Sequence, residues 1–225
     1  MNGQHLPKSN RLLLRILVPL GRILFRIYFR LQCEGCENAA ALAHEGKPFI
    51  MVMNHASNLD AAVIGVCGGV SFIANLSFPG KKELFDNPLT GWLMRGLGGI
   101  RLDRETLDLS TARMILLILR SGRGVGVAPE GTRSPTGEVL PFKSGFVKLA
   151  LRFNVPVLPV GVQGTHEALP KHAVLPRPQK VVVRFGKPID LARVAAENGN
   201  ENSDDELAEL VRKEIIRLSG ATSQP

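Results

Sequence analysis

A histidine and an aspartate five positions apart, His55 and Asp60, are the residues of this chain best suited to acid–base chemistry. On one continuous helix their side chains would point about 140° apart and could not meet. They can meet if His55 lies in a turn after a strand and Asp60 in the first turn of the next helix. The aspartate would then accept a hydrogen bond from one ring nitrogen and leave the other to take a proton from a hydroxyl. The pair is a candidate general base; the alternative is a turn histidine beside a helix-capping aspartate.

The residues around the pair favour this strand–turn–helix arrangement. Residues 49–53 form a short apolar run typical of a buried strand, and residues 59–66 are small and apolar enough for a helix. Between them, Ser57 and Asn58 are residue types that commonly cap a helix N-terminus. We therefore expect the pair to span the end of a strand and the start of a helix.

Strand-like and helix-like segments alternate along the rest of the chain. We expect strands at residues 49–53, 70–75, 100–102, 124–128, 156–162 and 180–185, and helices from residue 60 and at 82–97, 107–120 and 142–153. Pro88 should bend the second of these helices. A last amphipathic helix begins at a capping box of Ser203 and Glu206, after a polar linker at residues 191–202. This alternation predicts an α/β fold with a mostly parallel central sheet flanked by helices.

The composition is ordinary for a globular protein, and the length allows one large α/β domain or two small ones. The chain has 225 residues, of which 44% are hydrophobic and 21% charged. Its three cysteines are too few for a disulfide framework, which fits a reducing compartment. Cys33 and Cys36 form a C-x-x-C pair, but the two further ligands that a structural zinc site needs are not close in sequence, so we expect no metal.

Most of the net charge of +8 belongs to the N-terminal segment. Residues 1–31 contain six basic residues and no acidic one, so the remaining 194 residues carry a net charge of only +2. The five arginines of residues 11–31 fall within about 100° of a helical wheel whose other positions are almost all apolar. The longest uncharged run inside this segment, residues 16–21, is far shorter than the roughly 20 residues of a membrane span. Arginines also interrupt it too often for a secretory signal.

We therefore expect residues 1–32 to form an amphipathic arm that lies in a membrane interface, kinked into two pieces at Pro19 and Gly21. The alternative is a surface helix packed on the domain's own core. Residues 33–190 would form the α/β domain, and residues 191–225 a linker and a C-terminal helix packed on it. The nearly neutral body, with one Trp and one Tyr, argues against binding of nucleic acid.

Three further clusters follow expected strands, where open α/β sheets place their sites. They are the run Gly-Gly-Ile-Arg-Leu-Asp-Arg that ends at Arg104, the run Pro-Glu-Gly-Thr-Arg-Ser at residues 129–134, and a Val- and Pro-rich run at residues 155–160. In the second cluster, Gly131 permits an unusual backbone angle and Arg133 offers a fork of donors for phosphate or carboxylate. Each cluster alone could be a turn with solvated charges, but their order and type together favour a common site.

With His55-x4-Asp60, these clusters resemble, in order, the four motif blocks of the glycerolipid acyltransferases, and most of all the PlsC-like 1-acylglycerol-3-phosphate (lysophosphatidate) acyltransferases. The resemblance covers about residues 45–190 and includes the Lys-Lys-Glu-Leu-Phe run that begins at Lys81 and the Phe-Lys-Ser-Gly run at 142–145. Arg101 and Ala128 depart from the pattern, since the family usually has an apolar aromatic residue at both positions. Arg101 bears on the identity of the acceptor more than on the type of reaction.

The resemblance implies an enzyme that moves a fatty acyl chain from acyl-CoA or acyl carrier protein to the free hydroxyl of 1-acylglycerol 3-phosphate, giving phosphatidic acid. His55 would be the general base and Asp60 its orienting partner. The expected substrate-binding residues are Lys81, Arg104, Glu130, Gly131, Thr132 and Arg133. Glu130 would meet the hydroxyl side of the acceptor, the cations would hold its phosphate, and N–H groups near Gly131 would stabilise the oxyanion. We expect no cofactor besides the acyl donor.

The apolar helix around residues 92–97 either lines an acyl groove that opens towards the bilayer or belongs to the core. Two alternative functions stay open: an acyltransferase for another acceptor, such as glycerol 3-phosphate, another lysophospholipid or a lyso-aminolipid, and a non-catalytic lipid-binding module. We expect a peripheral protein on the cytoplasmic face of the cell membrane. Acyl-chain length, the choice between the two donors and the oligomeric state do not follow from the sequence.

Overall fold

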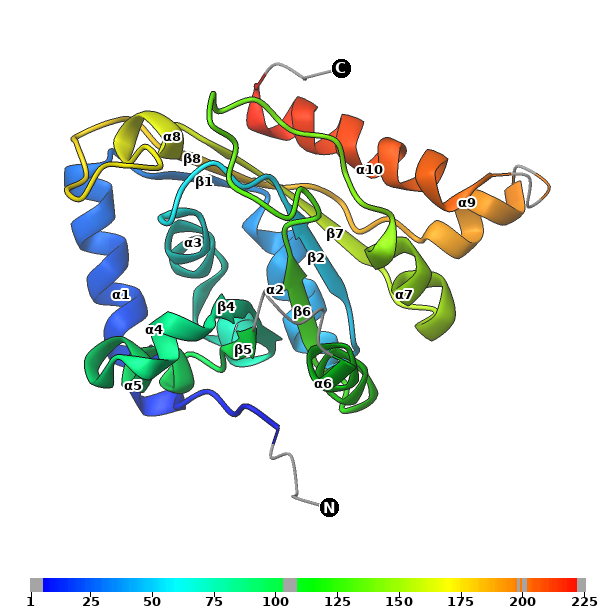
Figure 1. Ribbon diagram of the computed structural model, residues 1–225, viewed down its shortest axis with the longest axis horizontal. Helices are drawn as coiled ribbons and strands as arrows, with labels where there is room; N and C mark the ends of the chain where they lie inside the picture. The colour runs from blue at the N-terminus through cyan, green and yellow to red at the C-terminus, as the bar shows by residue number, and fades with distance from the viewer. Residues whose placement is uncertain (1–5, 103–108, 198, 200–201, 222–225) are drawn as a thin grey trace.

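A six-stranded sheet forms the centre of the protein in a computed structural model that describes residues 6–102, 109–197, 199 and 202–221 (Figure 1). The strand order is β1-β8-β7-β2-β6-β3, and all neighbours are parallel except β7 and β8. The strands are β1 (Gln32–Glu34), β2 (Ile50–Met53), β3 (Leu76–Ser77), β6 (Gly124–Val127), β7 (Val157–Gln163) and β8 (Val182–Phe185). The predicted α/β fold with a mostly parallel sheet is confirmed.

Helices cover both faces of this sheet (Figure 1). One face carries α2 (Cys36–Glu45) and α3 (Asp60–Ala74), with α1 (Arg11–Tyr28) packed outside α3. The other face carries α6 (Leu109–Arg120), α7 (Gly145–Phe153), α9 (Leu191–Glu197) and α10 (Asp204–Ser219). A small sheet of β4 (Pro79–Lys81) and β5 (Ile100–Leu102) lies with α4 (Lys82–Asp86) and α5 (Pro88–Gly96) beside the start of α1, while the single turn α8 (Thr165–Ala168) follows β7.

The central strand β2 is buried on both faces, which explains its uninterrupted apolar sequence. Met51 and Met53 pack into the core beneath α2 and α3, whereas Ile50 and Val52 pack beneath the helices of the opposite face. Alternate residues of a strand point to opposite faces, so a strand covered on both sides has no polar positions. This burial holds the carboxyl end of β2 in place, and the chain that follows it carries His55.

Helix α1 is one continuous helix that packs along α3. Leu14 and Val18 are buried against Ile73, and the Cβ of any larger residue at position 21 would lie 3.0 Å from Val66. The helix continues through the exposed Pro19, so the prediction that it breaks into two pieces is wrong. A proline on the solvent side can keep its ring away from the packed face, and the contacts with α3 hold both halves in line.

Three predicted segments differ in the structure. Residues 70–75, predicted as a strand, are the end of α3 and its C-cap, after a non-helical Gly69. Residues 191–202, predicted as a linker, contain α9. The helix predicted at 82–97 is two helices, because Asn87 ends α4 and caps α5 by accepting hydrogen bonds from the N–H groups of Leu89 and Thr90. The capping box of Ser203 and Glu206 at the start of α10 is confirmed.

Cys33 and Cys67 form a disulfide between β1 and α3, with 5.6 Å between their Cα atoms. Three cysteines are too few for a disulfide framework, but a single bond needs only two side chains that the fold brings together. Cys36 is free, and partial burial raises the pKa of its thiol. The disulfide also removes the cysteine count as an argument for a reducing compartment.

Among the described residues, none of the helices combines the length and the apolar character that crossing a bilayer demands.

Candidate active site

His55 lies two residues beyond the end of β2, and Asp60 is the first residue of α3. The predicted strand–turn–helix arrangement is therefore present. Ser57 and Asn58 do not cap the helix from the N-cap position, which Leu59 occupies without a side-chain bond. The turn is closed instead by the carboxylate of Asp60, which bends back over the residues before it.

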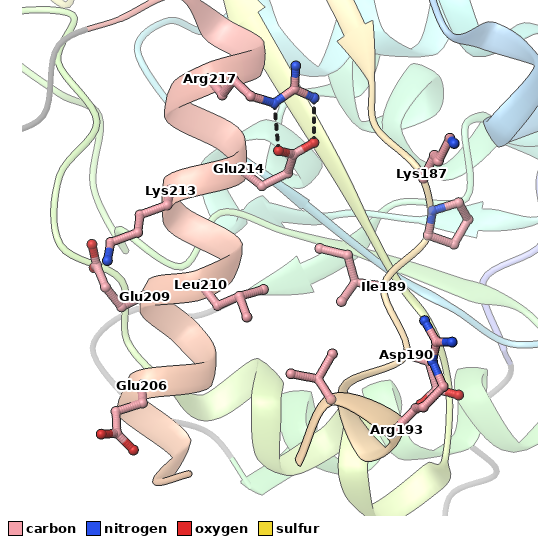
Figure 2. A pocket seen from close by; sticks show the side chains of 12 residues that line it. Lys187, Ile189, Asp190, Arg193, Glu206, Glu209, Leu210, Lys213, Glu214 and Arg217 are labelled. Carbon is pink, nitrogen blue, oxygen red and sulfur yellow. Dashed lines mark hydrogen bonds and ion pairs between the residues drawn. The ribbon is translucent and has the colours of Figure 1, made fainter. Parts of the chain in front are cut away.

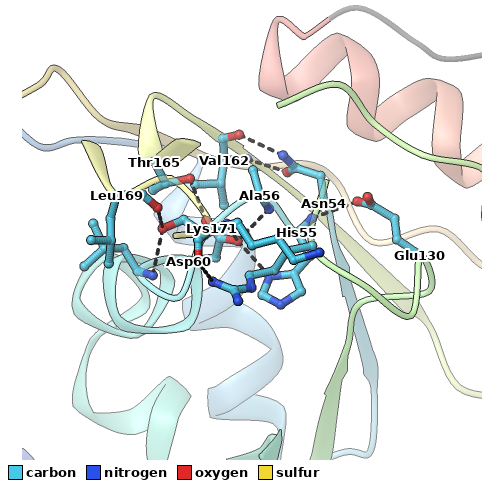
Figure 3. Close-up of polar contacts among 12 residues, drawn as sticks. Asn54, His55, Ala56, Asp60, Glu130, Val162, Thr165, Leu169 and Lys171 are labelled. Atoms are coloured by element: carbon cyan, nitrogen blue, oxygen red, sulfur yellow. Dashed lines mark hydrogen bonds and ion pairs between the residues drawn. The ribbon is translucent and has the colours of Figure 1, made fainter. Parts of the chain in front are cut away.

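Four donors converge on this carboxylate, which is completely buried (Figure 3). Oδ2 lies 2.8 Å from His55 Nδ1 and accepts the backbone N–H groups of Ala56 and Ser57 at 2.9 and 2.8 Å. Oδ1 accepts the hydroxyl of Thr165 at 2.6 Å. An ionised carboxylate only accepts hydrogen bonds, so an aspartate surrounded by donors takes its hydrogen bond from the protonated Nδ1 of the imidazole.

The other ring nitrogen of His55 is available for chemistry. Nε2 makes no hydrogen bond to any described residue, and the side chain is 21% exposed. With Nδ1 held by Asp60, the neutral ring presents an unprotonated Nε2 that can accept a proton. The arrangement can therefore act as a general base with a fixed orientation and a partner that stabilises the imidazolium.

The backbone around His55 is held from three sides. Its carbonyl accepts the N–H of Ser134 at 2.8 Å. The buried side chain of Asn54 donates to the carbonyl of Val162 at 2.9 Å and accepts the N–H of the same residue at 2.8 Å. These two bonds extend the pairing between β2 and β7 by one residue beyond the strand, so the turn begins from a fixed point.

Glu130 holds the third side, because its side-chain carboxylate binds the backbone N–H of His55 (Figure 3). Its Oε1 accepts the N–H of His55 at 2.7 Å, and its Oε2 accepts the N–H of Leu140 at 3.3 Å. Burial raises the pKa of this carboxyl to about 7, and the nearby charge of Asp60 adds to the effect, while the two N–H groups and Arg212 oppose it. The sequence-based expectation placed Glu130 on the hydroxyl of the acceptor; in the structure both its oxygens are engaged within the protein.

The turn after Glu130 carries the other residues of the Pro-Glu-Gly-Thr-Arg-Ser run. Gly131 has a φ of +71°, which favours glycine, and its N–H is donated to the carbonyl of Ala128 at 3.1 Å. That N–H is therefore not free for an oxyanion. The N–H groups of Thr132 and Arg133 have no acceptor among the described residues, and the Thr132 side chain is exposed.

Two cations lie beside this turn. Arg133 is partly exposed, and its Nη1 makes a long contact of 3.5 Å with the carbonyl of Lys171. The ammonium of Lys143 is next to Gly131, since a Cβ added there would lie 3.3 Å from Nζ. An anionic group bound at the turn would meet both cations.

The structure does not bring every expected cation to this turn. Lys81 lies at the end of β4 in the small sheet, exposed, and no described contact joins it to His55 or Arg133. Arg104 lies outside the described residues. Arg101 forms an exposed ion pair with Asp86 at 2.9 Å, so its charge has a partner within the protein.

Several residues of the site were not foreseen. Thr165 binds Asp60 from a position 105 residues further along the chain, so no local pattern could identify it. Asn54 directly precedes His55, and the sequence indicated no role for its side chain beyond a place in the turn. Lys143 belongs to the Phe-Lys-Ser-Gly run, and the position of this run shortly after the second cluster was the one available signal.

No group of three or more His, Cys, Asp or Glu side chains suited to a metal ion occurs among the described residues. A groove of about 870 Å³ lies elsewhere, between α10 and the segment 187–194, with charges of both signs on its rim (Figure 2). None of the expected site residues that the structure describes lines it. The site around His55 is therefore built from the β2–α3 turn, the turn after β6 and the end of β7.

Curated relatives are named for one activity. The chain is 31% identical over 187 residues to a "1-acyl-sn-glycerol-3-phosphate acyltransferase" of Limnanthes douglasii, with 81% of this chain and 63% of that protein covered. It is 35% identical over 177 residues to the protein of the same name from Saccharomyces cerevisiae, with 76% and 55% covered. The chain thus spans somewhat more than half the length of these two relatives.

A solved structure is similar as well, and it carries the comparison over the whole fold. The crystal structure of the 1-acyl-sn-glycerophosphate (LPA) acyltransferase PlsC from Thermotoga maritima matches with a TM-score of 0.73 and 32% identity, covering 94% of this chain and 80% of that one. Residues 30–163, which include β2, the His55–Asp60 turn and all of β7, match the family described as Acyltransferase. This chain therefore belongs to the acyltransferase family.

Proposed function

We propose that the protein transfers a fatty acyl chain from acyl-CoA or acyl carrier protein to the free hydroxyl of 1-acylglycerol 3-phosphate, giving phosphatidic acid. The observation that carries the proposal is the 2.8 Å contact between His55 Nδ1 and a completely buried Asp60. A lipid-binding module has no need of an imidazole held in one orientation with its second nitrogen left open. The names of the relatives support the choice of acceptor.

The reaction follows from the free nitrogen of His55. Nε2 accepts the proton of the acceptor hydroxyl while the hydroxyl oxygen attacks the thioester carbonyl of the donor. The carbonyl electrons move onto oxygen, then return as the C–S bond breaks, and the imidazolium gives its proton to the departing thiolate. Asp60 stabilises the imidazolium between the two steps. No covalent intermediate on the protein is required.

The turn after β6 supplies the remaining parts. The N–H groups of Thr132 and Arg133, which lack acceptors among the described residues, are the donors that we assign to the oxyanion. Arg133 and Lys143 hold the phosphate of the acceptor, with Lys81 and Arg104 as supporting cations. Glu130 positions the backbone of His55 rather than the substrate.

The acyl chains enter from the side of α1 and α5. Trp92 is 57% exposed and Leu89 is also exposed, whereas Leu97 packs against the core between α1 and α3. Part of the segment at residues 92–97 thus belongs to the core, and part of it is exposed and able to contact acyl chains. We assign the exposed part, Trp92, to the entrance used by apolar chains.

We infer that the protein is peripheral and binds the bilayer through α1. One side of α1 is buried against α3, and the other exposes a row of large apolar side chains: Leu12, Ile16, Leu20, Ile23, Leu24 and Ile27. Arginines flank this row. The negative surface of the cytoplasmic leaflet attracts basic segments, so we place the protein on that face. We keep residues 1–32 as the membrane arm, 33–190 as the catalytic domain and 191–225 as the C-terminal segment.

The test is His55→Ala, assayed with a lysophosphatidate and an acyl thioester. Loss of the oriented base should lower the rate by about 10²–10⁴-fold, with fold and donor binding preserved. His44→Ala is the matched control, because His44 is an exposed histidine at the end of α2. A well-folded His55→Ala protein that keeps most of its activity would refute the proposed mechanism.

A further inference from the structure

The loop that follows α8 has an apolar tip in basic surroundings. Val174 is 91% exposed and Leu175 is 77% exposed, more than any other large hydrophobic side chain among the described residues. The loop, residues 169–180, contains basic side chains and a histidine but no acidic residue: Lys171, His172, Arg177 and Lys180. An apolar tip with a basic collar is complementary to an anionic lipid surface.

Hydrogen bonds and prolines fix the backbone conformation of this loop. Its ends meet where the N–H of Arg177 donates to the carbonyl of Ala168 at 2.7 Å, and a turn forms where the N–H of Ala173 donates to the carbonyl of Pro170 at 3.0 Å. Prolines at positions 170, 176 and 178 restrict it further. The tip is therefore held out from the domain by ordered chain, at little further cost in conformational entropy on binding.

The tip continues the exposed face of α1. The hydroxyl of Tyr28, the last residue of α1, donates to the carbonyl of Pro176 at 2.8 Å. Ile27, beside it, is among the most exposed side chains of α1. Figure 1 shows this loop, in yellow, at one end of α1, and α4 and α5 at the other end.

Exposed apolar side chains gather on these elements. Of the 14 large hydrophobic residues exposed in the described part of the chain, 12 belong to α1, α4, α5 and the tip. A second copy of the chain on this face would bring the arginines of two α1 helices together, whereas an anionic bilayer neutralises them. The charges therefore select lipid as the occupant.

The base of the same loop borders the active site (Figure 3). The hydroxyl of Ser57, in the His55–Asp60 turn, donates to the carbonyl of Leu169 at 2.8 Å. Arg133 Nη1 lies 3.5 Å from the carbonyl of Lys171. Only a few residues thus separate the tip from the side chains that would hold the phosphate.

We propose that Val174 and Leu175 insert into an anionic bilayer alongside α1, so that a lipid acceptor passes from the headgroup layer directly to Arg133 and His55. The route of the acceptor rests on the proposed acyl transfer; insertion of the tip does not. The tip acts as a second membrane contact at the mouth of the site. It sets the orientation of the domain, which contact through one helix alone would leave free to rotate about the axis of that helix.

The test uses a single tryptophan as a depth probe. Leu175→Trp is made in a Trp92→Phe background and mixed with vesicles of phosphatidylcholine and phosphatidylglycerol. We expect Trp emission to shift to the blue and to be quenched by lipids brominated along the acyl chains. Leu210→Trp in the same background is the control, since Leu210 is a half-exposed leucine on α10, and its emission should not change. Replacing Val174 and Leu175 by Asp should lower the vesicle partition coefficient by about tenfold or more.

Three outcomes would overturn the proposal. The first is co-sedimentation with vesicles while the emission at position 175 stays unshifted. The second is emission that is already blue-shifted without lipid and that returns on dilution, which would mean that a second copy covers the tip. The third is no binding to vesicles at all. The same measurements on His55→Ala, which should bind vesicles like the native protein, separate failure of lipid contact from failure of the proposed reaction.

Discussion

The side chain of Glu130 contacts the backbone of His55 rather than its imidazole. The carboxylate of Glu130 accepts the backbone N–H of His55, and the imidazole of the same residue is held by Asp60. Two carboxylates thus act on one histidine, one on its main chain and one on its imidazole. Their environments differ, since Asp60 receives four hydrogen bonds and Glu130 receives two. This difference leads to a prediction about pH.

The stability of the protein should fall as pH rises from about 4.5 to about 7 because of Glu130. Burial raises the pKa of this carboxyl from 4.5 to about 7, so in that range the folded chain binds more protons than the unfolded chain. The contribution is fully present below pH 4.5 and is lost as pH passes 7; its size is on the order of 3 kcal/mol. The measurement is the free energy of unfolding in urea at pH 5 to 8, for the native protein and for Glu130→Gln.

Subtracting the free energies of unfolding of the two proteins isolates the carboxyl, because all other ionisable groups are the same in both. The native protein should lose its stability relative to Glu130→Gln as pH increases. A difference that is flat from pH 5 to 8 would show that the carboxyl titrates normally in the folded state.

Arg133 should determine the preference for an acceptor with a phosphate. Its guanidinium can hold two phosphate oxygens at once, whereas the ammonium of lysine is a point charge without that geometry. Arg133→Lys should therefore lower the use of lysophosphatidate by about tenfold or more, with donor binding and fold unchanged. The measurement is the ratio of kcat/KM for lysophosphatidate and for a matched monoacylglycerol. Equal use of both acceptors by the native protein, or an unchanged ratio in the variant, would contradict this role.

At the scale of elements, the sequence predicted most of the sheet and misjudged segments whose structure depends on distant partners. The strands around β2, β5, β6, β7 and β8 follow from short apolar runs bounded by turn residues. Residues 70–75 have the same appearance but continue α3, because α1 covers them and a helix buries Ile73 against Leu14. A short apolar run fits either period, and only the neighbouring element decides between them.

The candidate site divides in the same way. The His55–Asp60 turn could be predicted because five residues of local sequence contain both partners and the strand before them. Thr165 could not, since it reaches Asp60 only after β7 has been placed beside β2. The disulfide of Cys33 and Cys67 likewise depends on how β1 and α3 pack, which cysteine spacing does not encode.

Helix α10 supports the site from outside the matched family region. Arg212 is buried, and it donates to the carbonyls of Val139 and Leu140 at 3.0 Å each. The N–H of Leu140 in turn donates to Glu130, which holds His55. Arg212, which lies 157 positions after His55 in the chain, therefore fixes the 139–140 segment that binds Glu130.

Arg212→Met should destabilise the protein by about 2–3 kcal/mol, because the carbonyl of the buried Val139 and that of the partly buried Leu140 lose their donors. It should also lower kcat by about tenfold, since displacement of Leu140 moves Glu130 and with it the backbone of His55. Denaturant unfolding and steady-state kinetics measure the two effects, and Arg212→Lys should restore part of both.

Arg217→Met on the same helix is the matched control. Arg217 forms an exposed pair with Glu214 at 2.7 Å (Figure 2) and does not contact the 139–140 segment, so its loss should leave the free energy of unfolding nearly unchanged. Equal effects of the two substitutions would mean that α10 contributes only general stability.

At the scale of the whole molecule, α1 gives the protein two sides. Its buried residues make it part of the domain, and its exposed apolar row faces away from it. The packed side of α1 matches the surface helix considered from the sequence, and the exposed row is the side that the proposed membrane contact would use. Figure 1 places α1 at one end of the molecule, with α9 and most of α10 towards the opposite end. A bilayer in contact with α1 would leave the α9–α10 end in water.

Reversing the charge of Arg15, Arg22 and Arg26 to Glu should release the protein from anionic vesicles. All three are exposed on α1, and each basic residue near such a surface contributes about 1 kcal/mol, so the binding constant should fall by about a hundredfold or more. The matched control reverses the charge of Lys187, Arg193 and Lys213. These substitutions change the net charge equally, but the three residues line the groove between α10 and the segment 187–194 (Figure 2). Co-sedimentation at low and raised salt measures both proteins. If the control loses as much binding as the α1 variant, net charge rather than the face of α1 governs attachment; if neither loses any and added salt has no effect, the basic arm does not bind the bilayer.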